Sequence, residues 1–301
     1  MQPLIQPPSI SHGQKVRVIS PSGALLEPER FEQGVKIWID RGYQVHIPPD
    51  LNQPWGYLAG TDAHRCQQLI EAWNDPDCVA IACTRGGYGA MRLLEKLNWQ
   101  DLNSHPKFLI GFSDITALLW GLAVHKGISG IHGCVLTTLA QEPDRSVQLL
   151  FDWLEGKRTS LTLNGTGWVN GKASGVLLPA NLNLATHLLS TSLCPDLANV
   201  ILAIEDVFEP PYKVDRMLTQ WRLSGAFAKI KGIALGRFSH AEPPADRPSL
   251  SMLEVWIDRL SDLNIPIVID LPFGHDGVNT PLAVGCMAEL DGDTGILHYW
   301  R

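Results

Sequence analysis

The chain has 301 residues, of which 45% are hydrophobic and 18% charged, and this composition argues against long disordered stretches. Its formal net charge is −7 and its Lys and Arg residues form no cluster, so we expect no nucleic acid among its partners. The length suits two domains of ordinary size or one large α/β domain.

The first 15 residues contain three prolines and no basic segment followed by an apolar core. A secretory signal is therefore not expected, and the cytoplasm is the predicted location. The apolar run 108–124 is interrupted by Ser113 and Asp114, whereas a membrane-spanning helix needs about 20 apolar residues. We therefore predict a buried strand followed by a buried helix, and no membrane partner.

The first half of the chain alternates short apolar runs with segments of helical period, which is typical of a parallel sheet covered by helices. In the segment 28–41, for example, Phe31, Val35 and Trp38 share one helical face, and Gly42 supplies a stop. Strands are predicted over 16–20, 43–47, 78–83 and 107–111, and helices over 28–41, 61–74, 91–97 and 115–125.

Beyond about residue 150 the pattern changes. Residues 158–175 are rich in Thr, Gly, Asn and Ser and are interpreted as the domain junction, which divides the chain into domains 1–157 and 158–301. The second domain is predicted to be a mixed, strand-rich α/β domain. Its strands are expected over 173–178, 200–204, 230–236 and 267–270, with a terminal hairpin that pairs 286–290 with 296–300.

Ser113 lies in the turn Gly111-Phe112-Ser113-Asp114, between a predicted strand and a predicted helix. Such a turn projects a serine from the sheet and aims backbone N–H groups, including that of Asp114, at the charge that develops after attack. Ser113 is therefore a candidate nucleophile. The alternative is that Ser113 only caps the helix, since serine is a favoured N-cap and the second glycine of the G-x-S-x-G motif is missing.

The loop 84–89 reads Thr-Arg-Gly-Gly-Tyr-Gly and follows the predicted strand 78–83. Its glycines permit positive φ and close backbone approach, so it could offer a second N–H donor beside Ser113. It lacks both G-x-G-x-x-G and the P-loop motif, which argues against phosphate binding. A plain tight turn is the alternative.

A serine nucleophile needs a base, and the base needs an orienting acid. His275 lies in a polar, glycine-flanked loop after a predicted strand, whereas His132 sits between apolar residues and is more typical of a core histidine. Glu205 directly follows the apolar run 200–204, where a buried charge needs a partner. Asp206 and Glu209 are competing candidates for the acid.

The cysteines are scattered without a C-x-x-C pair, and most lie in apolar surroundings, so we interpret them as small core residues. No His or Cys spacing typical of a metal site occurs, and neither a metal nor another cofactor is predicted. The six cysteines are Cys66, Cys78, Cys83, Cys134, Cys194 and Cys286.

Together, several segments resemble the LD-carboxypeptidases, the serine peptidase family of muramoyltetrapeptide carboxypeptidase and the microcin C self-immunity hydrolase. The resemblance extends from about residue 16 to 285. It rests on Ser20-Pro21-Ser22, the loop 84–89, Gly111-Phe112-Ser113-Asp114-Ile115-Thr116, Ile204-Glu205-Asp206, and Phe273-Gly274-His275 ahead of Pro281-Leu282-Ala283-Val284-Gly285.

The resemblance implies a role for each matched residue. Ser113 would be the nucleophile, Glu205 would orient the imidazole, and His275 would act as general base and then general acid. Gly87 and the N–H of Asp114 would form the oxyanion hole. It further implies a Rossmann-like N-terminal domain that carries the nucleophile, a smaller C-terminal domain that carries Glu and His, an active site between them, and a homodimer.

The implied reaction is cleavage of the L,D-peptide bond of cytoplasmic peptidoglycan tetrapeptides, which releases the terminal D-alanine from a small peptide or muropeptide. Arg85 could bind the substrate's terminal carboxylate, or it could form a structural salt bridge. The family's usual Gly-Gly-Asn segment reads Pro179-Ala180-Asn181 here, and Cys134-Val135 replaces the usual Pro-Met. Two alternatives therefore stay open: a hydrolase of peptidyl or aminoacyl nucleotides, and a non-catalytic ligand-binding protein.

Overall fold

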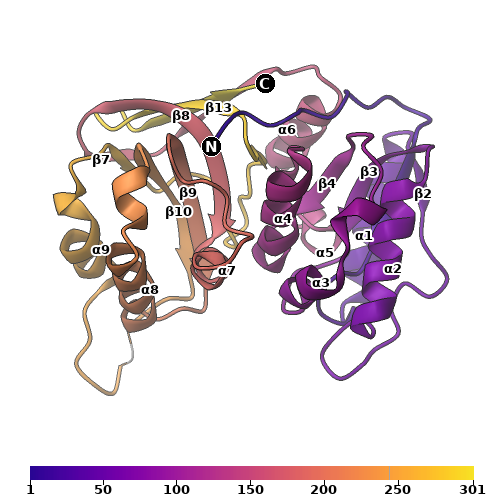
Figure 1. The fold of residues 1–301 in the computed structure, drawn as a ribbon, viewed down its shortest axis with the longest axis horizontal. Coiled ribbons are helices and arrows are strands. Elements are labelled where there is room, and N and C mark those ends of the chain that lie inside the picture. The colour runs from indigo at the N-terminus through magenta and orange to yellow at the C-terminus, as the bar shows by residue number, and fades with distance from the viewer. Residues whose placement is uncertain (244) are drawn as a thin grey trace. The chain divides into compact units, whose positions relative to one another are not determined.

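The computed structural model describes residues 1–243 and 245–301, and the chain forms two compact units (Figure 1). The N-terminal unit contains residues 4–159 together with 281–284. The C-terminal unit contains residues 1–3, 160–280 and 285–301. Each unit has its own sheet, and each is described separately below.

The N-terminal unit is built on a six-stranded sheet in the order β12-β5-β4-β3-β1-β2. Strands β1 to β5 pair in parallel, and β12 joins antiparallel to β5. The strands are β1 (Lys15–Ile19), β2 (Gln44–His46), β3 (Cys78–Cys83), β4 (Phe108–Gly111), β5 (Ile131–His132) and β12 (Leu282–Ala283). The helices are α1 (Pro28–Asp40), α2 (Asp62–Asn74), α3 (Ala90–Lys96), α4 (Thr116–Lys126), α5 (Leu136–Leu139) and α6 (Asp144–Leu154).

The predicted parallel α/β arrangement of the first half is confirmed, and its central strands β3 and β4 are continuous, largely buried apolar runs. All six residues of β3 belong to one such run, and five of them are buried. Helix α1 buries Phe31, Val35 and Trp38 on one face and ends before Gly42, whose φ is 83°.

The C-terminal unit is built on an eight-stranded mixed sheet in the order β6-β14-β13-β8-β9-β10-β11-β7. The four central strands β8 to β11 pair in parallel, and the remaining pairs are antiparallel. The strands are β6 (Ser160–Asn164), β7 (Thr166–Val169), β8 (Lys172–Asn181), β9 (Val200–Val207), β10 (Gly232–Ser239), β11 (Ile267–Ile269), β13 (Met287–Asp291) and β14 (Ile296–Trp300). The helices are α7 (Leu182–Leu188), α8 (Pro211–Leu223) and α9 (Met252–Leu260).

The terminal hairpin is confirmed, since Met287 pairs with Trp300 and Asp291 with Ile296. Residues 158–175, interpreted from the sequence as the domain junction, contain regular secondary structure. They form β6, β7 and the beginning of β8, and both β6 and β7 lie at edges of the sheet. The reason is period-two patterning: in β6, Leu161 and Leu163 are buried while their polar neighbours face outward, as suits an antiparallel edge strand.

The six cysteines form no disulfide, and all except Cys194 are buried, which agrees with their interpretation as core residues. Within residues 1–243 and 245–301, no helix is long and apolar enough to cross a membrane.

Candidate active site

Ser113 lies just beyond the carboxyl end of β4 and opens a 3-10 turn (Ser113–Ile115) that leads into α4. Its φ is 60°, in the left-handed region that residues other than glycine rarely adopt. The cap positions of the turn and of α4 are Phe112 and Ile115, so the interpretation of Ser113 as a simple helix cap is wrong. A strained serine between a strand and a helix is instead the geometry that exposes a nucleophile.

The glycine-rich loop 84–89 lies against the Ser113 side chain. A methyl group on Gly86 would lie 3.1 Å from Ser113 Cβ and 3.3 Å from its Oγ, so glycine permits this close approach. Gly87 follows with a φ of 106°. The loop and Ser113 are therefore neighbours, while the roles of the Gly87 and Asp114 N–H groups in an oxyanion hole stay predictions.

The Asp114 side chain ties the turn at Ser113 to two other loops. Its carboxylate is buried and accepts hydrogen bonds from Ser22 Oγ at 2.6 Å and from the Ala90 N–H at 2.7 Å. Burial raises the pKa of Asp114, and these two hydrogen bonds oppose that rise. The side chain thus fixes the turn that carries Ser113, a role that the sequence did not indicate.

Arg65 of α2 is a second structural residue that sequence reasoning missed. Its side chain is fully buried and donates to the carbonyl oxygens of Gly60 at 3.1 Å, Gly89 at 2.9 Å and Pro21. The Asp62 carboxylate forms an ion pair with the Arg65 guanidinium. One guanidinium therefore holds three loops at the carboxyl end of the sheet, using the several donors that arginine offers. Arginine side chains are rarely fully buried, so the sequence of α2 gave no reason to expect a buried arginine at position 65.

Arg85 already has a carboxylate partner. Its Nη1 donates to Glu27 Oε2 at 3.0 Å and to the Ala24 carbonyl at 3.0 Å. The Arg85 side chain is 24% exposed and that of Glu27 38% exposed. The structure therefore contains the salt bridge that was the alternative to carboxylate binding by Arg85, in a setting where an ion pair contributes under about 1 kcal/mol.

In the C-terminal unit, the structure joins the two residues chosen as base and orienting acid. His275 Nδ1 lies 2.6 Å from Glu205 Oε2, and Glu205 is fully buried near the end of β9. The carboxylate can only accept, so Nδ1 carries the proton and Nε2 is the atom that can take one. Burial by itself would lower the pKa of His275, but the charge and hydrogen bond of Glu205 outweigh it, and the pKa is raised.

The loop that carries His275 is anchored on both sides. Phe273 is buried against Gly236, where a methyl group would lie 2.5 Å from its ring. Gly274 has a φ of 133°, and its N–H donates to Asn279 Oδ1 at 3.3 Å. The glycine flanking His275 therefore serves the close packing of the loop.

The competing acids bind other groups. Asp206 accepts from Asn181 Nδ2 at 2.8 Å and from the Asn183 N–H at 2.9 Å, and Glu209 accepts from Asn183 Nδ2 at 2.6 Å. Burial, with the nearby charge of Glu205, raises the pKa of Asp206 to about 7. Asn181 also lies 3.4 Å from Glu205 Oε1, so it links the two carboxylates. Sequence reasoning did not predict this link.

His132, the competing base, is fully buried in β5, and its ring packs edge-on against that of Phe112. A position closed to solvent agrees with its interpretation as a core histidine. The buried imidazole is a poor candidate for proton exchange with a substrate.

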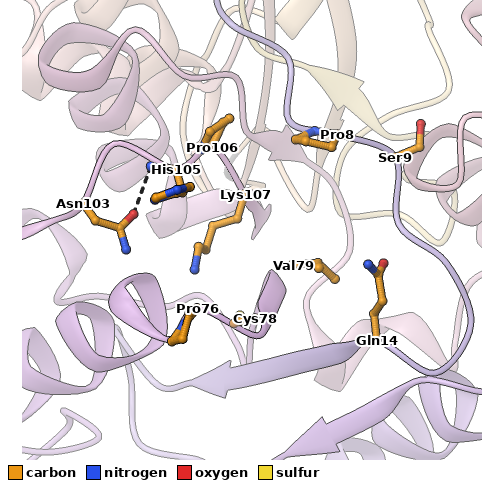
Figure 2. A pocket seen from close by; sticks show the side chains of 10 residues that line it. All are labelled: Pro8, Ser9, Gln14, Pro76, Cys78, Val79, Asn103, His105, Pro106 and Lys107. Carbon is orange, nitrogen blue, oxygen red and sulfur yellow. Dashed lines mark hydrogen bonds between the residues drawn. The ribbon is translucent and has the colours of Figure 1, made fainter.

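A cavity of about 400 Å³ lies elsewhere in the N-terminal unit (Figure 2). Gln14, Cys78 and Lys107 in its wall lie at the amino ends of β1, β3 and β4. Lys107 is buried there and donates to the Asp75 carbonyl at 2.8 Å. Ligands of open α/β sheets bind at the carboxyl ends of the strands, where Ser113 lies, so this cavity is not the candidate site.

Two family models match the chain. Residues 16–133 match the LD-carboxypeptidase N-terminal domain, and residues 174–290 match the LD-carboxypeptidase C-terminal domain. Together these segments cover more than half of the chain and include Ser113, Glu205 and His275.

Individual relatives are similar over nearly the whole length. A Synechocystis protein with a provisional carboxypeptidase name is 51% identical over 295 residues, covering 98% of this chain and 97% of that protein. The murein tetrapeptide carboxypeptidase of Pseudomonas aeruginosa is 30% identical over 293 residues, covering 93% and 94%. The microcin C7 self-immunity protein of Escherichia coli is 25% identical over 299 residues, covering 87% and 86%.

Among solved structures, the muramoyltetrapeptide carboxypeptidase from Oxalobacter formigenes superposes with a TM-score of 0.86 at 28% identity. The match covers 95% of this chain and 99% of that one. The α/β architecture is therefore shared along the full length of that enzyme.

Proposed function

The chain belongs to the LD-carboxypeptidase family, and from this premise we propose that it is a serine peptidase of cytoplasmic peptidoglycan fragments. It would cleave the L,D-peptide bond of a tetrapeptide and release the terminal D-alanine. The observation that carries the proposal is the 2.6 Å contact between His275 and buried Glu205. The strained backbone of Ser113 supports it independently.

The proposed mechanism assigns a role to each residue. Ser113 Oγ attacks the scissile carbonyl while His275 Nε2 takes its proton, and Glu205 stabilises the resulting imidazolium. The N–H groups of Gly87 and Asp114 would stabilise the oxyanion. His275 then protonates the leaving amine of D-alanine, and water hydrolyses the acyl-enzyme with His275 again as base. The mechanism requires Ser113 and His275 to meet during turnover.

The substrate is tested by incubating the purified protein with a tetrapeptide that ends in D-alanine and measuring free D-alanine by chromatography. The matched control is the same tetrapeptide ending in L-alanine. We expect release from the first peptide and at least about 100-fold less from the second, because the other stereoisomer misplaces the reacting carbonyl. Cleavage of an aminoacyl sulfamoyl nucleotide without any D-alanine release would contradict the proposal and favour the nucleotide alternative.

Arg85 is proposed to bind the substrate's terminal carboxylate by exchanging Glu27 for it, because their partly exposed ion pair is weak. Arg85→Ala should then raise KM about 10- to 100-fold, as expected for loss of a charge-assisted hydrogen bond. Glu27→Gln, which removes the competing carboxylate, should leave KM unchanged or lower it. If both variants raise KM equally, the pair is purely structural.

A further inference from the structure

Three large aromatic side chains stand exposed in the N-terminal unit although the proposed mechanism uses none of them. The exposed fractions are 54% for Trp55, 68% for Tyr57 and 50% for Tyr88. The Tyr57 and Tyr88 rings contact each other edge-on, with centroids 5.7 Å apart. The Arg92 guanidinium lies over the Trp55 ring at 5.9 Å. We call Trp55, Tyr57 and Tyr88 the aromatic cluster.

The backbone that carries this cluster is tied to its surroundings. The Ala24 N–H donates to the Tyr57 carbonyl at 3.0 Å, and the Trp55 N–H donates to that of Leu58 at 3.0 Å. Buried Arg65 holds Gly60 and Gly89 on either side. The backbone that carries the rings is therefore fixed, while the rings are exposed to water. Exposed rings that contact each other, as Tyr57 and Tyr88 do, form an apolar patch of the kind that can serve as an interaction site.

The cluster is continuous with the loop that contacts Ser113. Gly86 packs against the Ser113 side chain, and Tyr88 follows two residues later, a span of at most about 7 Å. A tetrapeptide with its last peptide bond at Ser113 extends three residues from that bond to its amino end, or about 10 Å. A peptide that runs from Ser113 along the loop 84–89 would therefore bring a group on its amino end within reach of Tyr88.

We infer that the aromatic cluster is a subsite for the sugar ring of a muramoyl group on the substrate's amino end. This inference rests on the proposed function. A pyranose ring presents one face of C–H groups, which packs on an aromatic ring, and a rim of hydroxyls, which needs polar partners. The cluster offers Tyr57 and Tyr88 for the face. Arg92 lies beside Trp55 for the rim, with its guanidinium oriented by hydrogen bonds to Asp62 at 2.9 and 2.7 Å. The Oxalobacter relative is named for a muramoyl-bearing tetrapeptide.

The test measures binding in the Ser113→Ala background, so that catalysis does not consume the ligand. Calorimetric titration compares muramoyl-tetrapeptide with the free tetrapeptide. We expect the muramoyl compound to bind at least about tenfold tighter, and Tyr57→Ala with Tyr88→Ala to reduce this ratio of Kd values to about one. Tyr57→Phe with Tyr88→Phe keeps the rings and should keep most of the ratio, which distinguishes lost stacking from misfolding.

The matched control is Tyr212→Ala, which removes a similarly exposed tyrosine of α8 and should preserve the ratio. The inference is overturned if the parent shows no preference for the muramoyl compound, if the double alanine variant retains it, or if an adenosine conjugate gains the same advantage. The proposed function fails by a different result, absence of D-alanine release by the protein with Ser113 intact.

Discussion

Ser113→Ala should lower kcat for D-alanine release by about 10⁴-fold or more, while KM changes by less than about threefold. Alanine removes only the Oγ, and the strained turn that carries it is held by Asp114 through Ser22 and Ala90. Loss of the proposed nucleophile is therefore expected to leave substrate binding in place. The measurement is steady-state kinetics on a tetrapeptide.

The matched control is Ser249→Ala. It removes an exposed hydroxyl that has no part in the proposed mechanism, so the variant should keep wild-type kinetics. A serine-directed fluorophosphonate supplies a second readout, since it should label the wild type at Ser113 and leave the alanine variant unlabelled. Turnover by Ser113→Ala within about tenfold of the wild type would remove Ser113 from the mechanism.

Glu205→Gln should lower kcat by about 10³- to 10⁴-fold, because an amide in place of the carboxylate no longer enforces the His275 tautomer or stabilises the imidazolium. Glu205 Oε2 lies 2.6 Å from His275 Nδ1, so the substitution acts directly on the imidazole. Asp206→Asn is the matched control: Asp206 binds Asn181 and Asn183, so its variant should lose much less activity. Equal losses in the two variants would contradict the assignment of Glu205.

The same pair predicts a pH dependence. His275 must be neutral to accept a proton, so kcat/KM should fall as pH drops through its pKa, which Glu205 raises. In the Glu205→Gln variant the pKa of His275 should fall. Burial lowers that pKa, and the substitution removes the Glu205 charge that opposes the lowering. The acid limb of the pH profile should therefore move to lower pH. A limb that stays in place in the variant would show that another group titrates.

Strong periodicity made much of the fold predictable. The apolar run of β3, the stripe on α1 and the pairing of Met287 with Trp300 follow from local patterns that tertiary contacts reinforce. Helix α8 was left unassigned although Val214, Leu218 and Trp221 form a buried stripe. The edge strands β6 and β7 were not predicted, because their exposed faces are rich in residues that also favour turns.

Residues of the candidate site could be predicted from the sequence where a polar side chain follows a predicted strand. His275 and Glu205 were selected in this way, and the structure brings them into contact. The supporting contacts were not predictable, because they join residues distant in sequence. Buried Arg65 holds three loops, and Asn181 links Glu205 with Asp206. No periodicity or motif encodes such contacts.

The central claim is that Ser113 is the nucleophile and that His275 and Glu205 activate it. The most direct test is a crystal structure of the protein inactivated with a peptidyl phosphonate that ends in a D-alanine mimic. The account predicts a covalent bond from phosphorus to Ser113 Oγ, a phosphonyl oxygen within hydrogen-bond distance of the Gly87 and Asp114 N–H groups, and His275 Nε2 within about 3 Å of the adduct. A phosphonate attached to another residue, or His275 turned away from an adduct on Ser113, would contradict it.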